Sequence, residues 1–232
     1  MRGSAGLRYC VWVSSNDFFR VSYKHKRLLA LVFEKNGLTA DPKQPWPWAN
    51  YPVSVALWAV SEDRSCNPLY SPKIRGATGF NSWATQNHDF TQHVLNDEPD
   101  FEEVLGRLAT AAAKDDVLVC HNVGYNIGKM RAPMCRMQIL DGATLLNLPR
   151  VCSCKRAWAS KVLDGKWLSL GELCNCFGVK QTTAHAADGD AKALAECITA
   201  ALQYTDLGLA KELGAVSKQS RNAGLGASKH VE

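Results

Sequence analysis

The chain has 232 residues, of which 46% are hydrophobic and 21% are charged, and its formal net charge is +5. This length fits one large domain, or one domain with tails, and no apolar run reaches the roughly 20 residues of a membrane span. The mild basic excess permits a polyanionic partner without requiring one. Nine cysteines, mostly in apolar segments, are typical of reduced thiols in an intracellular protein.

The first 27 residues form a basic extension. Its basic residues, set against the single acid Asp17, are Arg2, Arg8, Arg20, Lys24, Lys26 and Arg27. This composition resembles an organelle-targeting segment, and a disordered basic arm or a vector-derived remnant has the same composition. Residues 9–13 also suit an added strand.

The next segments predict an antiparallel meander. Residues 28–34 form a strand that is buried on both faces and places Val32 and Glu34 on the same face. A loop rich in Pro and Trp over 41–52 leads into a second strand over 53–60. A third strand or irregular segment follows over 66–74, with turns at 61–63 and 67–68.

The second half of the chain alternates strands and helices. The periodicity predicts a helix over 100–113, a strand over 116–122, and helices over 125–134, 168–179 and 188–205. Residues 139–148 hold a further strand or helix that the pattern does not assign. Residues 152–166 are basic and expected to be exposed, and residues from 215 onward are expected to form a flexible tail.

Strands followed by alternating strands and helices predict a mixed α/β sheet with helices packed on it. Ligands of such sheets bind beyond the strand ends, which here carry Glu34 and the pair His121-Asn122.

Residues 184–194 contain the strongest chemical pattern. Asp190 lies near the start of the last helix, where free N–H groups and the helix dipole stabilise an anion. His185, on the preceding connection, offers a proton acceptor at neutral pH. A base beside an anchored carboxylate suits metal-assisted hydrolysis, whereas the simpler interpretation is a loop histidine and a helix cap.

Five segments occur in the order and spacing of one known family. They are Val-Phe-Glu-Lys-Asn-Gly-Leu at 32–38, His-Asp-Phe-Thr at 88–91, His-Asn-Val-Gly-Tyr-Asn at 121–126, the helix at 170–179 that ends in Phe-Gly-Val, and His-Ala-Ala-Asp-Gly-Asp-Ala at 185–191. The chain resembles the DEDDh (DnaQ-like) 3′–5′ exonucleases, which have a ribonuclease H-like fold. The resemblance implies a domain over 28–210, between the extension at 1–27 and a flexible tail at 211–232.

The resemblance implies four carboxylates that hold two divalent ions. Glu34 and Asp190 match two of them, and His185 matches the general base. Val32 and Asn126 replace the other two, and shifting the first strand so that Asn36 becomes the second position still leaves one carboxylate there. Asn126 offers a carbonyl oxygen as a weaker metal ligand. Asp41, Asp141 and Asp188 are candidate substitutes that the sequence does not place.

The replacement of two carboxylates by Val32 and Asn126 predicts a low nuclease activity. Two divalent ions about 4 Å apart repel by on the order of 15 kcal/mol at an effective dielectric constant of about 20, and two carboxylates offset this poorly. We therefore expect at most one Mg²⁺ or Mn²⁺, and a nucleic-acid-binding protein with weak or no nuclease activity. The alternatives are an active 3′–5′ exonuclease on single-stranded RNA or DNA, and a protein-interaction scaffold, with a larger nucleoprotein assembly as a candidate partner.

Further residues are candidates for contacts with nucleic acid. Trp46 and Trp48 can stack on bases, and Lys155 and Arg156 can contact phosphates, beside the strand-end pair His121 and Asn122. Packing of the Pro-rich loop and a solvated basic face are the competing explanations. The pairs Cys152/Cys154 and Cys174/Cys176 allow a zinc site, although their spacing favours free thiols.

Overall fold

The computed structural model describes residues 27–36, 51–76, 90–140, 142–154 and 168–204. Five strands form one sheet in the order β3-β2-β1-β4-β5. The strands are β1 (Leu28–Lys35), β2 (Pro52–Val60), β3 (Cys66–Tyr70), β4 (Val117–Cys120) and β5 (Arg150–Cys152). β2 is antiparallel to β1 and β3, whereas β4 is parallel to β1 and β5. The predicted mixed sheet, with its antiparallel meander, is confirmed.

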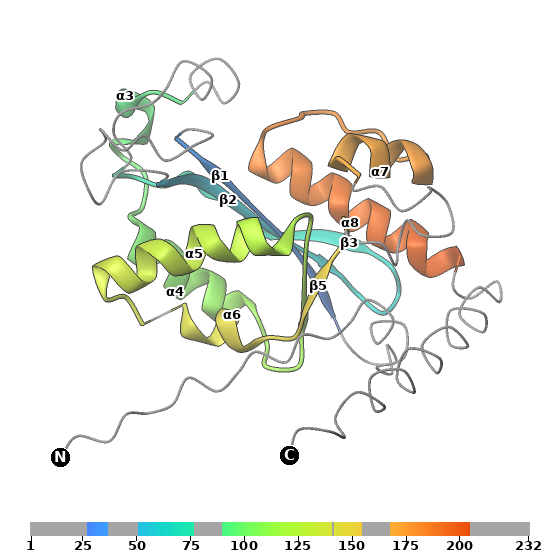
Figure 1. Ribbon diagram of the computed structural model, residues 1–232, viewed down its shortest axis with the longest axis horizontal. Coiled ribbons are helices and arrows are strands. Elements are labelled where there is room, and N and C mark those ends of the chain that lie inside the picture. The colour runs from blue at the N-terminus through green and yellow to red at the C-terminus, as the bar shows by residue number, and fades with distance from the viewer. Residues whose placement is uncertain (1–26, 37–50, 77–89, 141, 155–167, 205–232) are drawn as a thin grey trace, which may run out of the picture.

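Helices cover both faces of this sheet. They are α3 (Gln92–Leu95), α4 (Phe101–Ala111), α5 (Val123–Met137), α6 (Ala143–Asn147), α7 (Leu170–Phe177) and α8 (Ala187–Tyr204). Figure 1 shows α4, α5 and α6 on one side of the sheet and α7 and α8 on the other. Among the described helices, none has the length and apolar character needed to cross a bilayer.

β1 is the central strand, and its side chains alternate between the two cores. Leu29, Leu31 and Phe33 pack with residues of α4 and α5. Leu28, Ala30 and Val32 pack with residues of α7 and α8. All eight residues of β1 are buried, as the continuous apolar run predicted. The strand therefore sends Glu34 and Lys35 to opposite faces of the sheet.

Local chemistry fixes several predicted helix ends. The Asp100 carboxylate accepts a hydrogen bond from the Glu103 N–H at 2.9 Å and begins α4. Ser169 and Glu172 form a capping box at the start of α7. Gly178 ends that helix with a φ of 67°, a left-handed conformation that glycine adopts without strain.

Three details of the sequence analysis are wrong or incomplete. The predicted turn at Asn67-Pro68 lies inside β3, where proline is tolerated because β3 is an edge strand. Cys152, Ser153 and Cys154 are buried rather than exposed, because Cys152 closes β5, a strand that we did not predict. The unassigned segment forms α6. The extension at 1–26, the loop at 41–50 and the tail at 205–232 lie outside the described residues.

The start of α8 depends on a glycine. A Cβ atom on Gly189 would overlap the Thr183 hydroxyl and lie 2.6 Å from the Thr183 carbonyl oxygen. We predict that Gly189→Ala lowers the free energy of unfolding by about 1–3 kcal/mol through overpacking. Gly128→Ala, in a helix position with nothing within 4 Å of the added atom, should raise it by about 0.5–1 kcal/mol. Urea unfolding measures both, and equal effects of the two variants would contradict the close packing.

Candidate functional site

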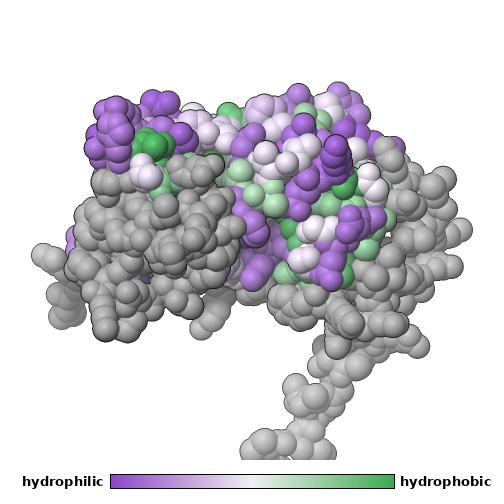
Figure 2. Space-filling view, turned by 90° about the horizontal axis from the view of Figure 1, so that it is seen from above, coloured by the Kyte–Doolittle hydropathy of each residue, from purple (hydrophilic) through white to green (hydrophobic). Residues whose placement is uncertain are grey.

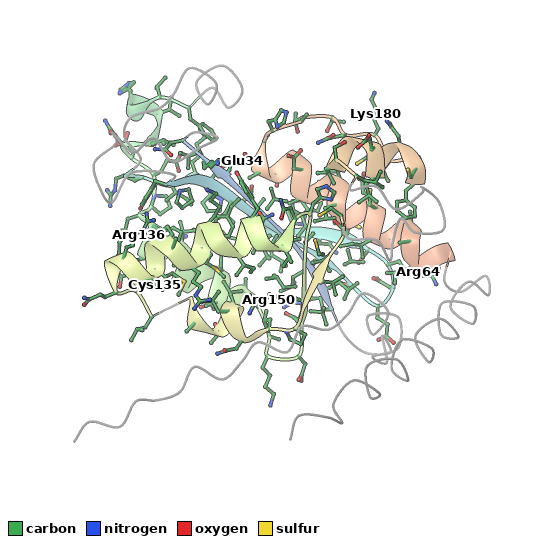
Figure 3. The ribbon with its side chains drawn as sticks, in the orientation of Figure 1. Glu34, Arg64, Cys135, Arg136, Arg150 and Lys180 are labelled. Carbon is green, nitrogen blue, oxygen red and sulfur yellow. The ribbon has the colours of Figure 1, made fainter. Side chains whose placement is uncertain are left out.

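Two carboxylates from distant parts of the chain meet where β1 ends. Glu34 belongs to β1 and Asp190 to the first turn of α8, and both side chains are buried. The negative charge of Asp190 acts directly on Glu34. Figure 3 shows Glu34 near the end of β1, between the helices that cover the two faces. The structure thus brings together the two acids that the sequence analysis selected.

Burial dominates the electrostatics of this pair. Desolvation, followed by the charge of Asp190, raises the pKa of Glu34 to about 8. Desolvation also raises the pKa of Asp190, although Gln181 Nε2 donates a hydrogen bond to its carboxylate at 2.6 Å. The helix dipole was expected to stabilise the Asp190 anion, and burial acts in the opposite direction by raising its pKa. The pair therefore favours a shared proton or a bound cation over two uncompensated charges.

His185 lies beside Asp190, on the connection that precedes α8. Its backbone adopts a left-handed conformation with a φ of 63°, and its side chain is exposed. The backbone N–H of His185 donates to the Asp190 carboxylate. This geometry leaves the imidazole on the solvent side of the two acids.

Asn126 is held by three hydrogen bonds. Its Oδ1 accepts from the backbone N–H of Phe33 at 2.8 Å. Its Nδ2 donates to the carbonyl oxygens of His121, at 2.8 Å, and Asn122, at 3.3 Å. The amide therefore ties β1 to the end of β4, and part of its acceptor capacity is already used.

The strand-end pair His121 and Asn122 makes bonds within the protein. The His121 ring nitrogens lie 2.9 Å from Ser153 Oγ and 2.9 Å from the Leu168 carbonyl oxygen. Asn122 is exposed and caps α5, where its side chain accepts from the Tyr125 N–H at 3.3 Å. A contact of either residue with nucleic acid stays a prediction.

A basic and aromatic cluster lies on the other side of β1. The Nζ atoms of Lys35 and Lys129 lie 5.1 Å and 4.9 Å from the centroid of the Tyr125 ring. Burial lowers the pKa of both lysines, and burial together with the charge of Lys35 brings the pKa of Lys129 to about 8. Neither lysine was predicted as a site residue, although alternation along β1 and the four-residue spacing from Tyr125 to Lys129 could have placed them together.

The face of the molecule seen from above Figure 1 is hydrophilic around a hollow near its centre (Figure 2). The end of β1 points toward this face in Figure 1. Of the other candidate residues, Trp46, Trp48, Lys155 and Arg156 lie outside the described part of the chain. Asp188, a candidate substitute ligand, accepts a hydrogen bond from the Trp58 indole at 2.8 Å, while Asp41 and Asp141 lie outside the described part.

The two cysteine pairs lie on opposite faces of the sheet and cannot share one zinc ion. Cys152 and Cys154 pack in the core beneath α4 and α5, with their sulfur atoms 3.2 Å apart. Cys174 packs beneath α8, 3.7 Å from the Cys197 sulfur. Within the described residues, no group of three or more His, Cys, Asp or Glu is arranged to hold a metal ion.

Solved structures show which class of protein has this fold. Exonuclease X in complex with 5′-overhanging duplex DNA is 18% identical, with a TM-score of 0.54 over 77% of this chain and 93% of that one. A 3′-exonuclease that recognises the histone mRNA stem-loop is 12% identical, with a TM-score of 0.60 over 77% and 82%. The E. coli ExoI–ssDNA complex, in its zinc-bound form, is 14% identical, with a TM-score of 0.61 over 85% and 44%. The fold is that of the ribonuclease H-like exonucleases.

Residues 60–198, more than half of the chain, match the model of the exonuclease family RNase_T. The chain therefore belongs to this exonuclease family and contains an exonuclease-like, nucleic-acid-processing domain. A search of curated proteins finds no match. Exonucleases of this kind typically depend on divalent metal ions.

The acids present suit one such ion rather than two. Glu34 and Asp190 supply carboxylate oxygens, the ligands that Mg²⁺ and Mn²⁺ prefer. Burial raises the pKa of both groups, and the charge of Asp190 raises that of Glu34 further, so a cation placed between them would stabilise their ionised forms. Val32 supplies an apolar side chain on the same face. An ion held there would act as a Lewis acid toward a phosphate oxygen.

The pKa of Glu34 has a consequence for stability. Its value of about 8 in the folded protein exceeds the ordinary 4.5, so the folded state binds the proton more tightly than the unfolded state. The contribution of Glu34 to the free energy of unfolding is fully present below pH 4.5 and is lost as the pH rises through 8. We predict that Glu34→Gln becomes increasingly stabilising, relative to the unchanged chain, as the pH rises from about 5 to about 8.5. Chemical unfolding at several pH values measures this difference, and a difference that does not change with pH would contradict it.

Binding of a divalent ion provides a second test. We predict that MnCl₂ at ten times its dissociation constant, at a pH near 8, stabilises the folded chain by about 1.4 kcal/mol. Asp190→Asn should abolish this effect, because one of the two carboxylates is lost. Asp115→Asn, at an exposed position, should retain it. Thermal unfolding with NaCl at matched ionic strength is the measurement, and equal shifts in the two variants would exclude this ion site.

Proposed function

We propose that this chain binds single-stranded nucleic acid at the end of β1 and that its nuclease activity is weak or absent. The observation that carries the proposal is the make-up of the site, in which only Glu34 and Asp190 contribute carboxylates among the described residues. Val32 and Asn126 stand at the other two positions that the family resemblance assigns to acids. The net negative charge is too small to hold two ions against their mutual repulsion.

The position of Asn126 strengthens this proposal. A neutral amide adds no negative charge, and one of its acceptor directions is already taken by the Phe33 N–H. Its NH₂ group faces the carbonyl oxygens of His121 and Asn122, which a carboxylate would repel. The local structure thus favours the amide that weakens the metal site.

Nucleic acid is the partner that the fold and the charge support. The similar structures include complexes whose ligands are duplex DNA with a 5′ overhang, a histone mRNA stem-loop and single-stranded DNA. The net charge of +5 favours association with phosphates. Because both RNA and DNA occur among these ligands, the proposal covers either.

A second candidate function is an active exonuclease with one metal ion. It is favoured by the meeting of Glu34, Asp190 and His185, which leaves an exposed imidazole next to two acids. In that case His185 would accept a proton from the attacking water, and Glu34 and Asp190 would hold the ion. A protein-interaction scaffold on the same fold is the third candidate.

The direct test is a nuclease assay on an end-labelled single-stranded oligonucleotide with Mg²⁺ or Mn²⁺. We predict binding that weakens with salt and little or no shortening from the 3′ end. Shortening by the unchanged chain, but not by Asp190→Ala, would establish an enzyme and overturn the proposal. If the chain showed no salt-dependent binding to RNA or DNA, the proposal would be overturned in favour of the protein-interaction scaffold.

A gain-of-function variant tests the reason for the low activity. We predict that Val32→Asp combined with Asn126→Asp raises metal-dependent shortening at least tenfold, because it restores four carboxylates. Asn126→Asp also loses two donated hydrogen bonds and should lower the free energy of unfolding by about 1–3 kcal/mol. Val32→Ala with Asn126→Ala is the matched control without added charge. A folded double-Asp variant that binds metal but remains inactive would refute this explanation.

A further inference from the structure

We propose that Lys35, Tyr125 and Lys129 form a binding site for a phosphate group of a nucleic-acid strand, on the face of β1 opposite the two acids. The inference rests on the proposed function and adds the place where the strand is held. Its ligand is a phosphodiester or terminal phosphate, recognised by two ammonium groups. Neither lysine is among the residues proposed to hold the metal ion, Glu34 and Asp190.

The geometry of the cluster is the main evidence. β1 and α5 place two ammonium groups near one aromatic ring, at 5.1 Å and 4.9 Å from its centroid. Lys35 is buried, whereas Tyr125 and Lys129 are partly exposed. Solvent and ligands can therefore reach Lys129, and Lys35 adds positive charge from below.

The charge of Lys129 is opposed by its basic neighbours. Lys35 and Arg136 both oppose the charge of Lys129, and Tyr125 offers only the weak attraction of a ring face. Glu34 lies beside Asp190, and its charge acts favourably on Lys35 but is not among the charges that act on Lys129. A phosphate placed against Lys129 would remove the repulsion between the cations.

The cluster continues along α5. Arg136 follows Lys129 by seven residues, close to two helical turns, and is exposed on the same side of the helix. Figure 3 shows Arg136 toward the C-terminal part of α5. A strand whose end lies at Glu34 and Asp190 would meet this basic face as it leaves the site.

The test is binding of a labelled single-stranded oligonucleotide to the full chain at several salt concentrations. We expect Lys129→Gln to weaken binding about fivefold and to reduce the slope of log K against log salt by about 0.7, the value for one phosphate contact. Lys129→Arg should restore both. Lys192→Gln, which removes a charge on α8 that lies 4.0 Å from Glu196, should change neither.

Stability separates a binding site from a structural cluster. If Lys129 serves binding, Lys129→Gln leaves the unfolding temperature unchanged or raises it, because a repelling charge is removed. Weaker binding that only accompanies lower stability would overturn the inference. Binding by the unchanged chain with no effect of Lys129→Gln would overturn it while the proposed function stands, and no binding by the unchanged chain would overturn both. If Lys129 were needed to bind inorganic phosphate but the chain bound no oligonucleotide, the inference would be overturned and the cluster would be a site for free phosphate.

Discussion

The alternation of side chains along β1 is the constraint from which the site follows. β1 is the middle strand of five and is buried on both faces, so each step along it changes the core that a side chain enters. Val32 and Glu34 therefore face α8, whereas Phe33 and Lys35 face α5. Glu34 and Lys35 are adjacent in the chain, yet Glu34 lies beside Asp190 of α8 whereas Lys35 lies against the Tyr125 ring of α5.

Asn126 provides a hydrogen-bond acceptor for β1 beyond the end of its pairing with β4. β1 pairs with β4 only from Leu28 to Ala30, and beyond that point the two strands no longer share ladder bonds. The buried N–H of Phe33 then needs another acceptor, and Asn126 Oδ1 provides it at 2.8 Å. The side chain thus extends the link between the strands past the end of their pairing. Asn126, at a position where the family resemblance implies a metal ligand, is part of the hydrogen-bonded framework.

Most of the fold was predictable, because apolar runs and helix caps are local signals. Glu34, Asp190 and His185 were found from motif order, and the structure brings them together. A turn was predicted at Pro68, inside the third strand, because the tolerance of an edge strand for proline depends on its neighbours, which the sequence does not show. The three-residue strand β5 is too short for a periodic signal. No motif encodes burial, and burial is the main cause of the raised pKa of Glu34 and of the lowered pKa of Lys129.

The buried acid pair contributes little to stability as it stands. Burying carboxylates that repel each other is unfavourable, and apolar side chains of similar size would satisfy the same packing at lower free energy. Neutral residues at Val32 and Asn126 reduce this penalty, since one proton shared between Glu34 and Asp190 is then enough to remove most of the repulsion. A divalent ion would neutralise the same two oxygen groups. Proton and ion therefore compete for one place, and because Val32 and Asn126 carry no charge, the competition favours the proton more than it would with four carboxylates.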